Sequence, residues 1–240
     1  MKVTVVGCSP AWPNPGGAQS GYLVEGAGRL LLDCGPGVLG RLRERETWPA
    51  VDAIAITHFH LDHWGDLVPW VWGSMYGPGS ALEKPRLYVP SHGRELLAEL
   101  GERLGSREMF EESFALSEYS DGEPFRAAGF DVTPVRVPHY TIESYGFRVE
   151  NESTVLAYSG DSAPSDALAG LAQDADLFVC EATLLEGRDE AEPRGHLSLD
   201  EALAAYSASG ARRLLVTHRP DERPLDHEVQ LAHDGLELDV

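Results

Sequence analysis

The sequence predicts an α/β fold in which two β-sheets are flanked by helices within one domain. Short apolar runs typical of strands fill the opening of the chain, and the later part alternates such runs with helix-like stretches. No break in composition, internal repeat or linker divides the 240 residues, and a chain of this length can bury one large core. We therefore expect a single domain over residues 1–240.

Ten apolar runs with β-branched character have the length and composition of strands. These runs are residues 3–6, 21–24, 30–32, 51–56, 87–89, 132–137, 145–149, 155–158, 177–179 and 214–216. The segment 219–227 is rich in proline and charge, so we expect a surface loop there, followed by a final strand at residues 236–240.

Five stretches between these runs have a helical pattern. They are residues 37–46, 64–75, 93–104, 164–171 and 199–209. Ser198 immediately precedes the last stretch and Glu201 lies three residues after it. This is the arrangement of a capping box, which predicts that a helix begins there.

The chain is strongly acidic. Its formal net charge is −20, with 39 acidic against 19 basic residues, and Lys2 and Lys84 are its only lysines. Tight binding of a long polyanion depends on clustered basic side chains that release counterions, and the sequence offers only short pairs such as Arg212 and Arg213. The balance argues against extended nucleic acid as a partner. It fits a solvated acidic surface, of the kind that high internal salt or a GC-rich genome produces.

Cys8, Cys34 and Cys180 are the only cysteines, an odd number without paired spacing. Neither a disulfide framework nor a thiolate zinc site is predicted, and we expect each cysteine to pack as a small buried apolar residue. No stretch approaches the roughly 18 to 20 consecutive apolar residues that cross a bilayer. The N-terminus runs directly into a strand pattern without a charged leader and cleavage site. These features predict a cytoplasmic protein without membrane contact.

The segment THFHLDH directly follows the apolar run 51–56 and places four ligand-type side chains within six residues. These side chains belong to His58, His60, Asp62 and His63. A loop that leaves a strand can turn His58 and His60 toward one position and Asp62 and His63 toward another. Burying four such groups unpaired is costly, and metal coordination satisfies them. The alternative is a solvated histidine-rich loop.

This segment matches in full the signature HxHxDH of the metallo-β-lactamase superfamily, which the sequence resembles over nearly its whole length. The opening GCSPAWPNPGGAQSGYLVEGAGRLLLDCGPG looks like the family's two strands joined by a glycine-rich loop, with Asp33 at the acidic position that supports the metal loop. Downstream, VPHY, YSGD and LLVTH supply His139, Asp161 and His218 in the family's order. The resemblance implies the metallo-β-lactamase fold, an αββα four-layer sandwich of two mixed β-sheets flanked by helices.

The resemblance also implies a site for two divalent metal ions. The ligands implied for the first ion are His58, His60 and His139, and those for the second are Asp62, His63 and His218, with Asp161 bridging both. Neutral imidazoles and carboxylates suit Zn²⁺, which is the default expectation. The carboxylates among the implied ligands also permit Mn²⁺ or Fe²⁺. Taken singly, His139 can be read as an ordinary strand-end histidine, His218 as a surface residue, and Asp33 as the end of a strand at a turn.

The stretch CEATLLEG followed by GHLSLDEA resembles the ribonuclease Z-like branch, including its cyclic-nucleotide phosphodiesterase relatives. In that branch a glutamate orients a histidine that is not a metal ligand, and here these residues would be Glu181 and His196. A histidine that donates a proton to an alkoxide leaving group adds about 10² to 10⁴ in rate, and a glutamate beside it favours its charged form. Together with Asp62, these are the candidate catalytic residues. The plainer reading is that His196 caps the helix beginning near Ser198.

Other histidines and aromatic residues are assigned smaller roles. His92, His227 and His233 do not directly follow strand-like runs and are expected to face solvent or form local hydrogen bonds. Aromatic residues after the metal motif are candidates for stacking on a nucleobase, namely Trp64, Trp70, Trp72 and Tyr76. Trp70 and Trp72 cannot face the same side of a helix, so at most one or two of the four are expected to reach a substrate.

The expected function is hydrolysis of phosphodiesters, most simply of a small molecule such as a cyclic nucleotide. The tRNA-processing members carry a long arm, commonly between the third histidine and the bridging aspartate, whereas only the hairpin-length segment 140–160 separates His139 from Asp161. A compact phosphodiester needs no basic groove, because two divalent cations supply most of the positive charge. Two alternatives stay open: a ribonuclease Z-like tRNA 3′-processing endonuclease, and a non-hydrolytic metal-binding sensor or redox protein. The resemblance also makes a homodimer plausible.

Overall fold

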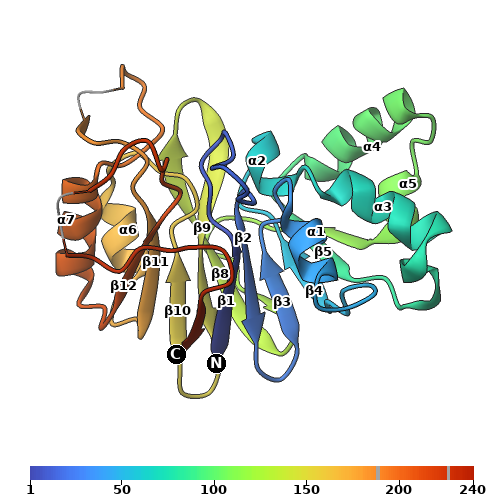
Figure 1. Ribbon diagram of the computed structural model, residues 1–240, viewed down its shortest axis with the longest axis horizontal. Coiled ribbons are helices and arrows are strands. Elements are labelled where there is room, and N and C mark those ends of the chain that lie inside the picture. The colour runs from blue at the N-terminus through green and yellow to red at the C-terminus, as the bar shows by residue number, and fades with distance from the viewer. Residues whose placement is uncertain (188–189, 226–227) are drawn as a thin grey trace.

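The computed structural model describes residues 1–187, 190–225 and 228–240 of the chain. In these residues two β-sheets pack against each other, and helices cover the outer face of each sheet (Figure 1). The order of the layers is helices, sheet, sheet, helices, which confirms the αββα arrangement expected from the sequence. Among the described residues, no helix combines the length and the apolar character that crossing a membrane requires.

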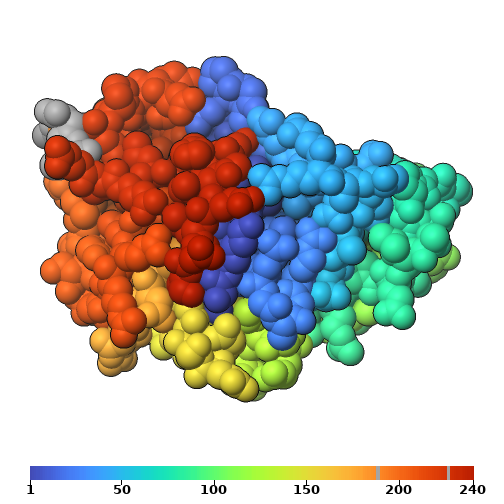
Figure 2. Space-filling model, turned by 60° about the horizontal axis from the view of Figure 1, so that its bottom comes forward, coloured from blue at the N-terminus to red at the C-terminus, as the bar shows by residue number. Residues whose placement is uncertain are grey.

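The first sheet has seven strands within the described residues, in the order β13–β1–β2–β3–β4–β5–β6. They are β1 (Lys2–Gly7), β2 (Gly21–Glu25), β3 (Arg29–Leu32), β4 (Ala53–Ala55), β5 (Arg86–Val89), β6 (Ala115–Glu118) and β13 (Glu237–Asp239). Strands β3 to β6 run parallel, whereas β1 pairs antiparallel with both β2 and β13. The pairing of β1 with β13 brings the two ends of the chain together, and Figure 2 shows the C-terminal segment beside the N-terminal strand.

The second sheet has six strands in the described part of the chain, in the order β12–β11–β10–β9–β8–β7. They are β7 (Phe125–Ala127), β8 (Phe130–His139), β9 (Ile142–Glu150), β10 (Val155–Tyr158), β11 (Leu177–Glu181) and β12 (Leu214–Thr217). Strands β10, β11 and β12 run parallel, and the other pairs are antiparallel. Both sheets are therefore mixed, as expected.

The helices are divided between the two outer layers (Figure 1). On the side of the first sheet lie α1 (Val38–Arg43), α2 (Leu61–Trp64), α3 (Leu67–Tyr76), α4 (Gly93–Leu104) and α5 (Met109–Ser113), together with a short 3₁₀ helix at Pro78–Ala81. On the side of the second sheet lie α6 (Asp166–Leu171) and α7 (Leu199–Ser209). The predicted capping box forms at the start of α7, where the backbone N–H of Ser198 donates to Glu201 Oε2 at 2.8 Å.

Strand β4, which leads into the metal motif, is buried on both faces. Ala53 and Ala55 pack between the two sheets, whereas Ile54 and Ile56 pack against the helices. Successive side chains of a strand point to opposite faces, so a strand covered on both sides is apolar throughout. This explains why residues 53–56 are all apolar.

Every predicted strand overlaps an observed one, and two predicted helices, 93–104 and 199–209, have the observed bounds. The helix predicted at 64–75 corresponds to α3, but its predicted start is wrong, because α2 ends at Trp64 and α3 begins at Leu67. The carbonyl of Asp62, which would continue the helix, accepts from Ser20 N instead, and Asp66 N donates to Cys34 O.

Four of the described elements lie outside every predicted stretch: β6, β7, α5 and the 3₁₀ helix at Pro78–Ala81. The side chains of β6 are exposed or half-buried, so this strand leaves no apolar run to recognise.

The expected surface loop at 219–227 is corrected at its start, since Arg219 is buried and its guanidinium donates to the carbonyls of Ala182 and Leu184. Residues 226–227 lie outside the described part. All three cysteines are buried, as expected.

Candidate metal centre

The polar residues singled out in the sequence leave the strands at one edge of the sandwich. Asp33 follows β3 and His58 follows β4, and these strands are parallel neighbours. Asp161 follows β10, Glu181 ends β11, and His218 follows β12, which are likewise parallel. Because the carboxyl ends of parallel strands meet at the same edge of a sheet, side chains that are 185 positions apart converge.

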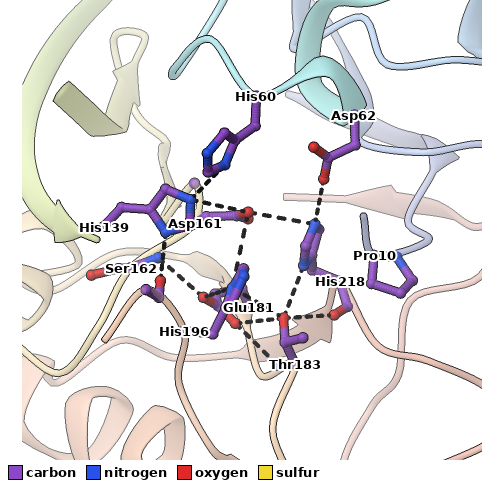
Figure 3. A network of polar contacts seen from close by, with 12 residues as sticks. Pro10, His60, Asp62, His139, Asp161, Ser162, Glu181, Thr183, His196 and His218 are labelled. Carbon is purple, nitrogen blue, oxygen red and sulfur yellow. Dashed lines mark hydrogen bonds and ion pairs between the residues drawn. The ribbon is translucent and has the colours of Figure 1, made fainter. Parts of the chain in front are cut away.

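The seven candidate ligands form two adjoining groups. Figure 3 shows His60, Asp62, His139, Asp161 and His218 of this set. Within each group the ligand atoms lie within 4.8 Å of one another, the groups being His58, His60 and His139, and Asp62, His63, Asp161 and His218. Asp161 Oδ2 lies between them, at 3.2 Å from His63 Nε2 and 3.9 Å from His58 Nε2. The two groups are those implied by the resemblance, and the position of Asp161 suits a carboxylate that bridges two cations.

Four imidazoles are fixed through Nδ1, which leaves Nε2 directed to the centre. The Nδ1 partners are Asp33 Oδ2 for His63 (2.7 Å), Thr57 Oγ1 for His58 (3.0 Å), the Gly195 carbonyl for His139 (2.6 Å) and Thr183 Oγ1 for His218 (2.9 Å). An Nδ1–H that donates to an acceptor sets the tautomer in which Nε2 carries the lone pair. These histidines are therefore held in the form that binds metal.

Two buried atoms of the cluster support the fit to cations. His58 Nε2 and Asp161 Oδ1 are buried without a hydrogen-bond partner in the described structure. Leaving buried polar atoms unpaired costs about 1–3 kcal/mol each, and coordination to a cation removes that cost. Burial also lowers the pKa of His139 to about 4, which keeps this imidazole neutral at physiological pH. Neutral imidazoles with carboxylates suit a divalent transition metal such as zinc and do not select one.

Asp33 lies beneath the cluster and is fully buried. Its carboxylate accepts from Thr57 N at 2.8 Å, from Tyr158 Oη at 2.8 Å and from His63 Nδ1 at 2.7 Å. It therefore holds the start of the metal motif and one of its histidines at once. This position agrees with the supporting role expected for Asp33.

Glu181 and His196 lie beside the cluster and form a close pair (Figure 3). His196 Nδ1 donates to Glu181 Oε1 at 2.9 Å. The other hydrogen bonds to the Glu181 carboxylate come from Ser162 N, Thr183 N and Thr183 Oγ1, at 2.9 to 3.0 Å. Burial by itself lowers the pKa of His196, but the Glu181 carboxylate outweighs it and raises that pKa to about 9. This carboxylate therefore favours the charged imidazole, and His196 Nε2 is left free of the pair.

Two residues at the site were not singled out in the sequence. Tyr140 packs its ring near His60, His139 and His196, with ring centroids 4.8 to 6.1 Å apart. Its position directly after His139 is the one signal that could have found it. Thr183 joins Glu181 to His218 through its hydroxyl, and it follows Glu181 by two positions in CEAT.

The aromatic residues expected near a substrate are divided between core and surface. Trp64 and Trp70 are buried in the core between the first sheet and its helices. Trp72 and Tyr76 are exposed on α3 and stack on each other. Trp64 and Trp70 therefore do not provide a stacking surface.

The histidines expected to be unrelated to the site lie elsewhere where they are described. His92 immediately precedes α4, and His233 Nδ1 is near the neighbouring carbonyl of Asp234. The expectation for His227 concerns a residue outside the described part of the chain. None of the metal groups formed by described residues contains His92 or His233.

Comparisons with known proteins show what this chain is similar to. A family model described as the β-lactamase superfamily domain matches residues 28–219. An uncharacterized protein of Mycobacterium leprae is 36% identical over 225 residues, which cover 92% of this chain and 78% of that protein. The probable metallo-hydrolase YhfI of Bacillus subtilis is 31% identical over 221 residues, which cover 92% of this chain and 87% of YhfI.

Two solved structures extend the comparison to the fold. The crystal structure of YhfI, described as a metallo-β-lactamase fold protein, superposes with a TM-score of 0.82 at 25% identity and covers 99% of both chains. The short form of human tRNase Z superposes with a TM-score of 0.79 at 26% identity, covering 100% of this chain and 99% of the human one.

Proposed function

Because this chain belongs to the β-lactamase superfamily, whose relatives include a probable metallo-hydrolase, we propose that it is a dinuclear metal-dependent hydrolase of small phosphodiesters. Cyclic nucleotides are the leading substrates. The observation that carries the proposal is the Glu181–His196 pair, which lies next to the two ligand groups. His196 also lies within ligand distance of His139 and Asp161, but its Nδ1 is bound to Glu181, and neither residue of the pair is among the seven implied ligands.

Two ions, with zinc the first choice, would be held by the two groups that meet at Asp161. When bound, they supply Lewis acidity toward water and toward the phosphoryl oxygens. Asp62 contributes a buried carboxylate whose Oδ2 is 3.2 Å from His218 Nε2. This contact holds His218, which is also an implied ligand of the second ion.

His196 supplies the proton that the leaving group needs. A hydroxide ion forms a new P–O bond as the P–O bond to the departing alkoxide breaks. The electron pair of the broken bond stays on the alkoxide oxygen, and a proton passes to that oxygen from His196 Nε2. Glu181 keeps the imidazole charged and oriented throughout, because its carboxylate accepts from His196 Nδ1. General acid catalysis of this kind contributes about 10² to 10⁴ in rate.

A compact substrate is favoured by the hairpin between His139 and Asp161. Strands β8 and β9 are joined by Tyr140 and Thr141 alone, and β10 follows within a few residues. No extended arm for gripping a tRNA body is built into this described segment. The net charge of −20 points the same way, since tRNA binding draws on basic contacts.

Cleavage of tRNA 3′ ends is the second candidate, and the resemblance to the short form of human tRNase Z favours it. A metal-binding sensor or redox protein is the third, and the Glu181–His196 pair argues against it because neither role uses a proton donor for a leaving group. Assembly as a homodimer remains a prediction from the resemblance.

The deciding experiment is activity of zinc- or manganese-loaded protein on cyclic nucleotides, bis-p-nitrophenyl phosphate and a 3′-extended tRNA, assayed side by side. We expect turnover of the first two and little of the third. Preference for the tRNA would move the assignment to the second candidate. Absence of any hydrolysis would refute the proposal.

The variant His196→Ala tests the mechanism. It should keep its metal content and lose about 10² to 10⁴ in turnover of a cyclic nucleotide, whose leaving group is an alkoxide. Because p-nitrophenolate departs without a proton, the loss on bis-p-nitrophenyl phosphate should be far smaller. Equal losses on both substrates, or loss of a metal ion, would show that His196 is not the general acid.

A further inference from the structure

The loop that carries His196 is docked onto the turn that carries the ligand His139. The Gly195 carbonyl accepts from His139 Nδ1 at 2.6 Å, and the Arg194 carbonyl accepts from Tyr140 N at 3.0 Å. Two successive carbonyls of the loop are therefore hydrogen-bonded to the turn. The position of the loop therefore depends on the β8–β9 turn, far from it in sequence.

Glu190 completes this contact from within the loop. One carboxylate oxygen accepts from the Tyr140 hydroxyl. The other accepts from Gly195 N at 2.8 Å and His196 N at 3.0 Å. One carboxylate therefore ties the backbone of His196 to the aromatic ring that follows His139. Hydrogen bonds to an ionised acceptor are stronger than neutral ones, so this is a firm tie for a surface loop.

Two further features show that the ring of Tyr140 is held in one place. Its backbone is left-handed, with φ 47°, an uncommon conformation for a residue with a bulky side chain. A Cβ atom at Gly195 would overlap the Tyr140 ring, so only glycine lets the loop approach this closely. Strained backbones and close approaches persist where the surrounding contacts over-determine them.

We propose that Tyr140 and Glu190 form a latch that positions the His196 imidazole beside the metal centre. Both are positioning residues, which act on the substrate only through His196, so the inference rests on the proposed function. Glu181 sets the tautomer of His196 from one side, and the latch sets the backbone of His196 from the other. Displacement of a catalytic group by about 1 Å can cost on the order of 10²-fold in rate.

The test compares Tyr140→Phe and Glu190→Gln with the control Tyr145→Phe. The control removes a similar hydrogen bond on the same hairpin, where Tyr145 Oη donates to Glu143 Oε1 at 2.6 Å, away from the His196 loop. We expect each latch variant to lose about tenfold or more in kcat on a cyclic nucleotide, to lose far less on bis-p-nitrophenyl phosphate, and to keep its metal content. The double variant should be no worse than Glu190→Gln, because Tyr140→Phe removes only the hydrogen bond that Tyr140 makes to Glu190, which Glu190→Gln already weakens.

Hydrogen exchange of the Gly195 and His196 amides gives a readout that needs no substrate. Both donate to Glu190, so their exchange should quicken several-fold in both latch variants and stay unchanged in the control. Unchanged exchange, or equal losses of kcat on the two substrates, overturns the latch. If the wild-type protein hydrolyses neither substrate, the proposed function fails, and faster exchange in the latch variants alone still supports the docking of the loop.

Discussion

Three non-glycine residues of the candidate metal centre have left-handed backbones. They are Asp33 with φ 60°, Tyr140 with φ 47° and His218 with φ 57°. Such conformations cost about 1–3 kcal/mol each. Each residue stands directly after a strand, at the point where the chain must turn its side chain toward the centre. The strain is therefore located where strand ends become ligand loops.

Asp161 is the residue on which both ligand groups depend. Replacing it by Ala should remove bound metal and activity together, because its Oδ2 is within 4.0 Å of histidines from both groups. Elemental analysis of the purified variant measures this. Asp131→Ala, a change at an exposed carboxylate paired with Arg126, is the control. Two tightly bound ions per chain in Asp161→Ala would contradict the bridging assignment.

At the scale of elements, α3 depends on a glycine for its packing. A Cβ atom at Gly73 would overlap the indole of Trp48, which is buried in the same core. Gly73→Ala should destabilise the protein by about 1–3 kcal/mol, since core side chains would have to move. Urea unfolding measures this change in stability.

The matched control is Gly40→Ala in α1. A Cβ atom there meets nothing within 4 Å, so the gain in helix propensity, up to about 1 kcal/mol, should leave the protein equally or more stable. If the two variants were equally stable, close packing on Trp48 would not be what requires glycine at position 73.

The start of α7 should contribute a pH-dependent part of the stability. The guanidinium of Arg194, with Ser198, lowers the pKa of Glu201 from 4.5 to about 2. A carboxyl whose pKa is lowered on folding stabilises the folded state above its unfolded pKa, and that stabilisation is lost as pH falls from about 4.5 to about 2.

We therefore expect Glu201→Gln to be less stable than the wild type at pH 7, by about 1 kcal/mol, and the difference to shrink by pH 3. Urea midpoints at the two pH values measure it. Glu102→Gln, at an exposed pair with Arg107, should change little at either pH. If the difference in stability between Glu201→Gln and the wild type were the same at pH 7 and pH 3, ionisation of the Glu201 carboxyl would not be its cause.

At the scale of the whole molecule, the charge of −20 should decide which polyanions bind. Few phosphates of a long RNA can be neutralised by side chains, so binding should be weak, and added salt should reveal no steep loss of a tight complex. Filter binding of tRNA over a range of salt concentrations measures this. Nanomolar, strongly salt-dependent binding would overturn the preference for a small substrate.

The sequence by itself determined the local features of this protein. The metal motif lies within six residues, the helices at 93–104 and 199–209 carry their own patterns, the second with a capping box, and buried strands appear as apolar runs. Each of these signals depends on neighbours in the chain, so each can be read without the fold. The same holds for His139, Asp161 and His218, which follow apolar runs directly and match the family's order.

Only the tertiary structure decided which groups meet. The contact of Asp33 with Tyr158 spans 125 positions, that of Asp62 with His218 spans 156, and that of Tyr140 with Glu190 spans 50. Such contacts depend on strand order and on the turns between elements, which no local pattern specifies. Strand β6 was missed for a related reason, since it is held by pairing with β5 and has no buried run of its own.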